Sequence, residues 1–214
     1  MRNQILFLIT LLMIVSCNNR EKESLNTERT DKHLPDSNAV KLNNKAARLM
    51  AEISSYNDSL NNVLYDSALI YLNQAIEIDS LYLMAYTHKA QILQRKGSLE
   101  QARQILNEVE IMKPDFAEAI MGQGFILEKM GKMELADQKY RQALKAYEKR
   151  LEDNPGNAIK IQSDIALLYI FLEDENRALD EIRNLILENP ENEELKVMEG
   201  YIKDFDRKKF LEDH

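Results

Sequence analysis

Residue types that often carry catalytic or metal chemistry are scarce in this 214-residue chain. It has one cysteine and three histidines, and no two histidines stand at the i,i+4 spacing that binds zinc on a helix. The adjacent acids Glu173, Asp174 and Glu175 could suggest a cation site. Capping of a helix start explains them more simply. We therefore expect no metal, no cofactor and no catalytic residue, and we predict that the chain is not an enzyme.

The charge balance argues against nucleic acid as a partner. The chain has 28 Lys and Arg against 36 Asp and Glu, a formal net charge of −8 at pH 7. An acidic surface repels phosphate backbones. Aromatic residues make up only 7% and tryptophan is absent, so the core must consist mainly of aliphatic residues, alanine, methionine and tyrosine. This composition suits helix packing, and we expect an all-α fold.

The single cysteine, Cys17, follows an apolar N-terminal segment. One positive charge, Arg2, precedes residues 5–15, which are almost continuously apolar. A helix of that length spans about 16 Å, short of the ~30 Å hydrocarbon core of a bilayer. The segment is therefore predicted to be a secretory signal peptide, residues 1–16, rather than a membrane span.

The residues around Cys17 resemble the bacterial lipobox. Ile14-Val15-Ser16-Cys17 has the aliphatic residue at −3 and the small residue at −1 that precede the lipidated cysteine. The resemblance implies cleavage after Ser16, diacylglycerol on Cys17 and an acylated amino terminus, with palmitate as a typical chain. Asn18 replaces the Asp that retains some lipoproteins in the inner membrane, which favours the outer membrane and leaves the leaflet open. The alternative is an incidental cysteine behind an ordinary signal.

Residues 17–37 are predicted to form a flexible tether. Between residues 18 and 37 only Leu25 and Leu34 are sizeable apolar residues, too few to offset the entropy of ordering. A coil of that length reaches roughly 25 Å.

The rest of the chain repeats itself at a spacing of 34 residues. Ala90, Gly97 and Ala102 are followed at that spacing by Gly124, Gly131 and Ala136. Weaker copies are present at Ala68, Leu72 and Ala75 and again at Ala166, Ala178 and Ile182. A small–large–small pattern, a glycine turn and a second such pattern predict an array of helix–turn–helix units.

This repeat resembles the tetratricopeptide repeat (TPR) family. The resemblance implies an α-solenoid of antiparallel helix pairs over residues 38–214, with about four repeats and a capping helix. The expected repeats cover residues 38–80, 81–114, 115–155 and 156–190, with the cap at 191–214. Ala90, Gly124, Ala166, Ala102, Ala136 and Ala178 should be nearly fully buried, because neighbouring helices approach most closely there.

Several helix boundaries can be expected from local signals. The first pair should run from Asn38 to about Asn61 and from Leu64 to Asp79. In the second, Gly97 ends the first helix and Ser98 caps the next in a capping box with Gln101. Asp115 is placed to cap the third pair. The last helix should run unbroken from Glu193 to about Leu211, with an apolar face that includes Phe205.

The period breaks after Ala136. The next matching alanine is Ala178, 42 residues later, and the apolar phase continues to Leu151. The helix from Met133 is therefore predicted to continue about two extra turns to Asp153. The extension is basic, and its candidate docking patch for an acidic partner or lipid headgroups is Lys139, Lys145, Lys149 and Arg150, next to Arg141. The alternative is a solvated face suited to a helix C-terminus.

The TPR resemblance also implies where a partner would bind. In that family the first helix of each pair lines a groove with its positions 2, 5, 9, 12 and 13. Those positions fall on Met84, Thr87, Gln91, Gln94 and Arg95, then Glu118, Met121, Phe125, Glu128 and Lys129, then Lys160, Ser163, Leu167, Ile170 and Phe171. The groove would grade from polar to apolar, with Phe125, Leu167 and Ile170 anchoring an apolar helix or an extended peptide. Part of this set, Phe171 above all, could instead pack against the C-terminal helix.

We therefore predict a non-catalytic interaction scaffold. It would be a lipid-anchored bacterial TPR lipoprotein of the cell envelope that binds a peptide or protein of an envelope assembly, with the bilayer as its second partner. The alternative is a lipoprotein that binds a glycan or small molecule for an outer-membrane uptake system.

Overall fold

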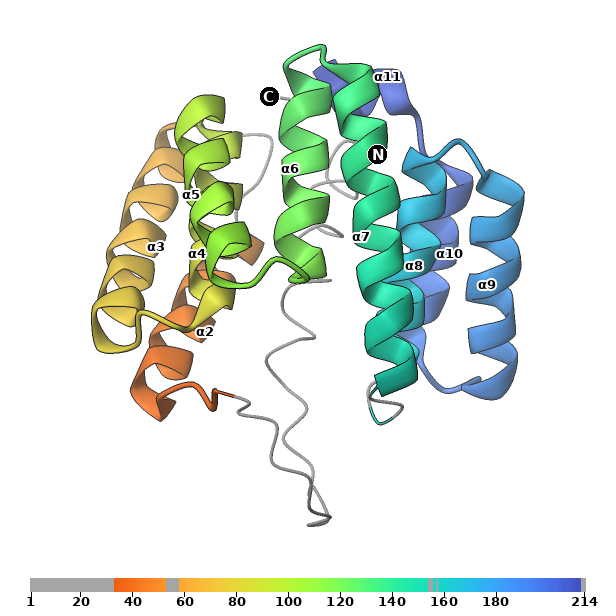
Figure 1. Ribbon diagram of the computed structural model, residues 1–214, viewed down its shortest axis with the longest axis horizontal. Helices are drawn as coiled ribbons and strands as arrows, with labels where there is room; N and C mark the ends of the chain where they lie inside the picture. Colours follow the sequence, from red (N-terminus) through yellow and green to blue (C-terminus); the bar gives the residue numbers. More distant parts are fainter. Residues whose placement is uncertain (1–32, 53–57, 154–155, 157, 213–214) are drawn as a thin grey trace.

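The computed structural model describes residues 33–52, 58–153, 156 and 158–212, and Figure 1 shows their arrangement. The predicted signal peptide, Cys17 and most of the predicted tether lie outside the described residues. The helices between residues 37 and 188 follow one another in chain order, with successive helices antiparallel. They are α2 (Ser37–Glu52), α3 (Asp58–Ile78), α4 (Leu83–Arg95), α5 (Leu99–Met112), α6 (Ala117–Lys129), α7 (Met133–Asp153), α8 (Ala158–Phe171), α9 (Glu175–Glu188), α10 (Glu193–Lys203) and α11 (Arg207–Glu212).

The helices form pairs that stack on their neighbours, as the 34-residue repeat predicts. The pairs are α2–α3, α4–α5, α6–α7 and α8–α9, with α10 packed against α9 and α8. The first helices of successive pairs also contact each other, α2 with α4 and α4 with α6. Hydrophobic clusters follow one another along the array, each shared by neighbouring helices. Stability of such a solenoid comes from contacts within and between adjacent units.

The turns inside three pairs share one geometry. Gly97, Gly131 and Glu173 have φ of 76°, 73° and 61°. After each, the next amide donates back to a carbonyl in the preceding helix, as in Ser98 N to Leu93 O at 2.8 Å and Asp174 N to Tyr169 O at 2.8 Å. This is the Schellman arrangement, in which glycine avoids the Cβ penalty of the left-handed conformation. Glu173 adopts the same left-handed conformation despite its Cβ.

The six small residues expected at the closest helix approaches are buried, which confirms that prediction. The five alanines are no more than 1% exposed. A Cβ added to Gly124 would overlap the ring of Tyr140, 2.6 Å from Cδ1. Tyr140 cannot yield easily, because its hydroxyl donates to Glu128 Oε2 at 2.6 Å and its ring packs on Phe125 and Phe171.

Gly124→Ala is therefore expected to lower the free energy of unfolding by about 1–3 kcal/mol, the usual cost of overpacking. Gly200→Ala is the matched control, since nothing lies within 4 Å of its added Cβ. Alanine should stabilise that helix by roughly 0.5–1 kcal/mol. Urea unfolding followed by circular dichroism measures both changes. Equal effects of the two substitutions would contradict the close approach at Gly124.

Most boundaries from α4 to α9 agree with the sequence predictions, and α7 does continue to Asp153. The first pair was predicted wrongly: α2 ends at Glu52 and α3 already begins at Asp58. Leu60 falls within the range predicted for the first helix, whereas it lies in α3 and is 50% exposed. Residues 53–57, which the prediction included in the first helix, lie outside the described residues.

Two predicted caps are also wrong. Ser98 occupies the N-cap of α5, but its side chain accepts no capping hydrogen bond, so the box with Gln101 does not form. The N-cap of α6 is Phe116 and not Asp115. Capping side chains are found instead at Asp174, which accepts from Arg177 N, and at Asn192, which accepts from Glu194 N.

The prediction of one unbroken C-terminal helix is wrong, and this is the largest difference between the predicted and the observed fold. Leu195, Met198 and Ile202 are buried, but α10 ends at Lys203 and α11 starts at Arg207. Asp206 Oδ1 accepts from Lys209 N at 3.1 Å and so caps the new helix. The break allows α11 to turn back onto the array, where Phe210 is buried among the aromatic side chains of α6 and α8.

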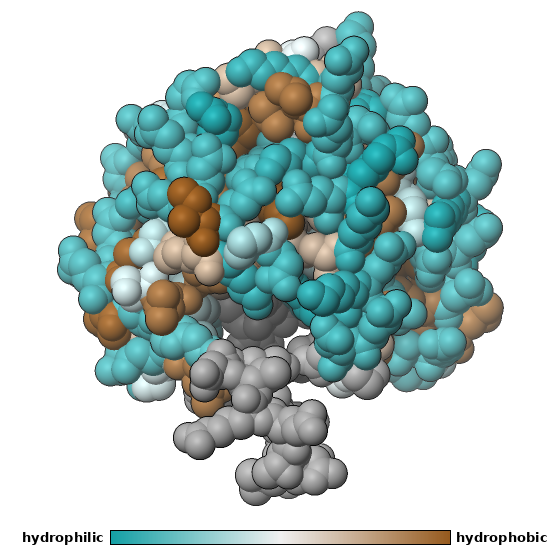
Figure 2. Space-filling model, in the orientation of Figure 1, coloured by the Kyte–Doolittle hydropathy of each residue, from teal (hydrophilic) through white to brown (hydrophobic). Residues whose placement is uncertain are grey.

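The chain enters the array beside the loop between α3 and α4. Asp79 accepts from His33 Nε2 at 2.8 Å, from Asp36 N at 2.9 Å and from Leu81 N at 3.0 Å. Residues 33–36 of the predicted tether are thus held against the first pair. No helix within the described residues is long and apolar enough to cross a membrane. The face drawn in Figure 2 is mainly hydrophilic, with separate apolar patches.

Candidate functional site

The predicted groove residues lie on α4, α6 and α8, and we call the surface that they form the A-helix face. Most of their side chains are covered rather than open to solvent. Half-buried members are Met84, Gln94, Arg95 and Lys129, and buried members are Thr87, Gln91, Met121, Phe125, Glu128, Ser163, Leu167 and Ile170. The face has a polar part that includes α4 and an apolar part on α6 and α8.

Two hydroxyl groups of the A-helix face form hydrogen bonds within their own helices. Thr87 Oγ1 donates to Met84 O at 2.8 Å, and Ser163 Oγ donates to Ile159 O at 2.8 Å. A hydroxyl bonded to the preceding helical turn is not poised as a nucleophile, because no base accepts its proton. Thr87 and Ser163 therefore use their hydroxyl groups to bond the backbone of their own helices.

A buried ionic network joins α6, α7 and α8. Arg150, in the extension of α7, places Nη1 2.6 Å from Glu118 Oε1 and Nη2 2.9 Å from Glu118 Oε2. Lys160 Nζ donates to Asp164 Oδ2 at 2.7 Å. The side chains of Glu118 and Asp164 are almost fully buried, at 6% and 4% exposure. The extra turns of α7 thus supply the cation that the carboxylate on α6 needs.

The pKa values of the two buried carboxyl groups are shifted in opposite directions. Burial works to raise the pKa of Glu118, but the hydrogen bonds and charge of Arg150 outweigh it and hold that pKa below its usual value. For Asp164 burial prevails over the charge of Lys160, and the pKa is raised. The pKa of Lys160 is raised: burial lowers it, but the charges of Asp164 and Glu118 more than compensate.

His88 is a buried structural contact between repeats. Its Nδ1 lies 2.7 Å from Asn43 Oδ1, which links α4 to α2. Burial, followed by the charge of Lys160, lowers the pKa of His88 to about 4. The imidazole is therefore neutral near pH 7, with Nδ1–H assigned as the donor to the amide oxygen.

The apolar end of the face is closed by the C-terminal segment, residues 204–212, which we call the latch. Phe210 of the latch has its ring centroid 5.8 Å from Phe125 and 5.1 Å from Phe171. Phe205 lies 5.1 Å from Phe171, and Phe125 and Phe171 are 4.6 Å apart. The alternative that left Phe171 packing against the C-terminal segment is the one observed.

Charged groups hold the latch beside these rings. Arg207 Nε donates to Glu128 Oε1 at 2.6 Å, and Arg207 Nη1 lies 2.8 Å from Glu173 Oε1. The Glu128 side chain is fully buried and its other oxygen accepts from Tyr140. Lys129 Nζ donates to Phe210 O at 3.1 Å. Glu128 thus needs Arg207, since a buried carboxylate without a cation is costly.

Most residues of the predicted basic patch have acidic neighbours within the chain. Lys139 pairs with Glu110 at 2.8 Å, Lys149 lies 4.0 Å from Asp115, and Arg150 belongs to the network with Glu118. Lys145 is exposed. Three of the four cations therefore have acidic neighbours within this chain.

No group of acidic, histidine or cysteine residues suited to a metal ion occurs in the part of the chain that the structure describes. Glu173 and Asp174, of the acidic run, are used by Arg207 and by the cap of α9. Sequence reasoning missed Arg207 and Phe210. Asp204 and Asp206, which flank Phe205, were the available signal for a helix break.

Comparisons with known proteins agree with this architecture. Residues 85–116 and 117–150 match the tetratricopeptide repeat family. The chain is similar to a thermophilic TPR protein of Thermus thermophilus, with a TM-score of 0.50 and 21% identity over 79% of this chain and 83% of that one. MamA 41-end from Desulfovibrio magneticus RS-1 gives 0.41 and 17%, over 84% and 90%. A tetratricopeptide repeat protein from Parabacteroides merdae ATCC 43184 gives 0.33 and 14%, over 79% and 89%. No curated protein matches the chain.

The family match shows tetratricopeptide repeats at residues 85–150, and the similarity to the Thermus structure shows an α-solenoid fold of that kind. Proteins built from such repeats generally mediate protein–protein interactions.

Proposed function

We propose that this chain is a non-catalytic interaction scaffold whose A-helix face binds a peptide or protein segment of a bacterial envelope assembly. We further propose that it is held at the outer membrane by acylated Cys17. The observation that supports binding most directly is the latch itself. A short segment, far away in sequence, already occupies the apolar end of the face through Phe210 and Arg207.

The latch is an example of a short segment that is ordered by its contacts with the A-helix face. An isolated helix as short as α11 is not stable in water, because nucleation is costly. Its conformation therefore depends on the A-helix face. A surface that orders six residues through one aromatic ring and one guanidinium can order a similar segment of another protein in the helix-in-groove mode.

Cross-linking on intact cells, followed by identification of co-purified proteins, tests the scaffold. We expect a specific envelope protein to be recovered with the chain. Recovery of no protein partner, together with tight binding of a sugar, would replace this proposal with the glycan-binding alternative. A sugar would need an exposed aromatic ring to stack on. Phe125 and Phe171 on this face pack against each other instead.

Acylation has its own prediction. Cys17→Ala should abolish fatty-acid labelling and release the protein from membranes. Each buried CH₂ contributes roughly 0.8 kcal/mol, so loss of two or three acyl chains removes most of the free energy that holds the protein at the membrane. Metabolic labelling and membrane fractionation measure both effects, with Ser16→Ala as a control that keeps a small residue before the cysteine. Unchanged membrane retention of Cys17→Ala would refute the lipid anchor.

A further inference from the structure

The N-terminal end of the array has an open helix face. Ala46 of α2 matches Ala90 of α4 in the repeat, and both are buried. Counting from them, the α4 positions that pack toward the preceding pair are Ala85, His88 and Ile92, all fully buried. The matching α2 residues are Lys41, Asn44 and Arg48. No described helix packs on that side of α2, and its two charged residues are exposed.

The terminal repeat of a solenoid needs a polar outer surface for solubility. That requirement does not explain why the charged residues on this surface are all basic. Lys41, Lys45 and Arg48 follow each other at i, i+4 and i+7 on one exposed stretch of α2. None of the three forms an ion pair within the described residues, although Lys45 Nζ lies 5.4 Å from the ring centroid of Tyr71. Like charges at i,i+4 destabilise a helix by a few tenths of a kcal/mol. The chain has a net charge of −8. Three neighbouring cations without ion-pair partners therefore form a local patch of positive charge on an acidic protein.

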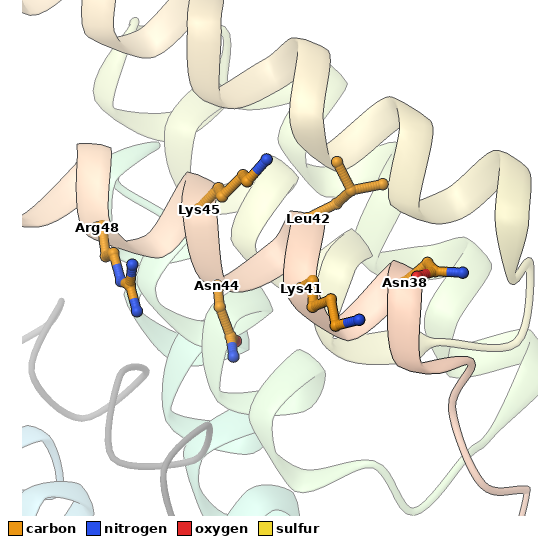
Figure 3. A pocket seen from close by; sticks show the side chains of 6 residues that line it. All are labelled: Asn38, Lys41, Leu42, Asn44, Lys45 and Arg48. Atoms are coloured by element: carbon orange, nitrogen blue, oxygen red, sulfur yellow. The ribbon is translucent and has the colours of Figure 1, made fainter.

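These cations border a shallow recess of about 450 Å³. Figure 3 shows Lys41, Asn44 and Arg48 pointing to one side of α2, with Lys45 and Leu42 on the other. Asn38 completes the lining. On the side that Lys41, Asn44 and Arg48 share, α2 thus offers an ammonium group, a guanidinium and an amide within about two helical turns. Lys45 adds a second ammonium group on the other side of the helix. Ammonium, guanidinium and amide donors are the groups that bind phosphate oxygens.

The place of α2 in the chain indicates where such an anion would be found. The described chain begins at His33, held by Asp79, and α2 starts at Ser37. Cys17 precedes His33 by 16 residues, which as a coil reach roughly 20–25 Å. If Cys17 is acylated, α2 is the helix whose distance from the bilayer is most tightly limited by the anchor. Leu34, 82% exposed, adds an apolar side chain at the same end.

We propose that the basic end of the array, Lys41, Asn44, Lys45 and Arg48, binds the phosphate groups of anionic lipids and so sets the first repeat against the membrane surface. Its location depends on the proposed anchor, whereas the surface itself does not. Cations near an anionic bilayer attract it additively, so an anchor and a basic patch together hold a protein in a defined orientation.

Flotation of the full chain with vesicles tests this proposal. The protein carries Cys17→Ala, so acyl chains play no part, and every variant shares the same N-terminal segment. Vesicles of phosphatidylethanolamine are compared with and without phosphatidylglycerol. We expect Lys41→Gln/Lys45→Gln/Arg48→Gln to lose the phosphatidylglycerol-dependent part of binding by roughly 100-fold, which corresponds to about 1 kcal/mol for each cation.

Two matched variants keep the result interpretable. Lys113→Gln/Lys132→Gln/Lys196→Gln removes three exposed cations from other elements and should bind as the parent does. Lys41→Arg/Lys45→Arg/Arg48→Lys conserves charge and should also bind, which excludes misfolding as the cause of the loss. Free inorganic phosphate should compete only weakly, since a single anion lacks the field of a bilayer. Binding independent of phosphatidylglycerol, or equal loss in both Gln variants, would overturn the proposal. Failure of Cys17→Ala to release the protein in cells would instead refute the anchor.

Discussion

Arg150→Met is expected to lower the free energy of unfolding by about 3 kcal/mol. The substitution keeps most of the side-chain volume but removes both hydrogen bonds to Glu118, whose carboxylate stays buried. Breaking a buried ion pair from one side typically costs about 3–5 kcal/mol. The lower end applies here because the charge of Lys160 also acts on Glu118. Urea unfolding followed by helical circular dichroism gives the value.

The double variant Glu118→Met/Arg150→Met is the matched control. With both charges gone, no unpaired carboxylate remains, and the loss should be much smaller than that of Arg150→Met alone. A double variant as unstable as the sum of the two single variants would contradict a specific pair.

The pH dependence of the same comparison has a defined sign. In the parent, the pKa of Glu118 lies below its ordinary value of 4.5, so the pair's stabilisation is present above pH 4.5 and is lost as pH falls through the lowered value. In Arg150→Met, burial would dominate and raise that pKa. The variant's deficit should therefore be largest near neutral pH and shrink as the solution is acidified towards pH 4.5 and below.

Phe210→Ala is expected to release the latch from the A-helix face. Phe210 is buried against Phe125 and Phe171, and truncating a buried phenylalanine to alanine costs about 3–5 kcal/mol. The contacts left to so short a helix include those of Arg207, the hydrogen bond from Lys129 to the Phe210 carbonyl and the packing of Leu211. The amides of residues 207–212 should then exchange with solvent far faster, while those of α4 and α5 keep their protection.

Lys209→Ala is the control on the same helix, since Lys209 is exposed and lies 3.7 Å from Asp206 on its own segment. Hydrogen exchange measured by mass spectrometry separates the two variants. Equal protection of residues 207–212 in the parent and in Phe210→Ala would show that the aromatic contact does not hold the latch.

The sequence predicted those parts of the fold that depend on local or repeated signals. Gly97 and Gly131 specify left-handed turns, and the alanine positions of the repeat specify close helix approach, so α4 to α9 could be predicted almost residue by residue. The extension of α7 was predicted because Leu144, Tyr147 and Leu151 keep helical phase. Each of these signals lies within a few helical turns.

Contacts between distant residues could not be predicted in this way. Arg207 and Glu128 are 79 residues apart, and no periodicity relates them. The break at Asp204 depends on the gain from burying Phe210 beside Phe171, a tertiary effect that overrides helical phase. The boundary between α2 and α3 was missed because Leu60 continues the apolar period of the first helix, although it lies in α3 and is exposed there. The role of the groove positions as a binding surface stays a prediction, and their contacts with Arg207 and Phe210 could not be predicted from sequence.

Site-specific photo-cross-linking from the A-helix face tests the central claim most directly. A photoreactive residue is placed at Lys129, beside the latch, or at Arg103 on α5, in the full chain and in its Phe210→Ala variant, in intact cells. Because the latch and a partner would compete for the same surface, opening the latch should raise the yield of protein adducts from position 129 and leave position 103 unchanged. An unchanged yield at position 129, or equal adducts from both positions, would contradict a docking function for the A-helix face.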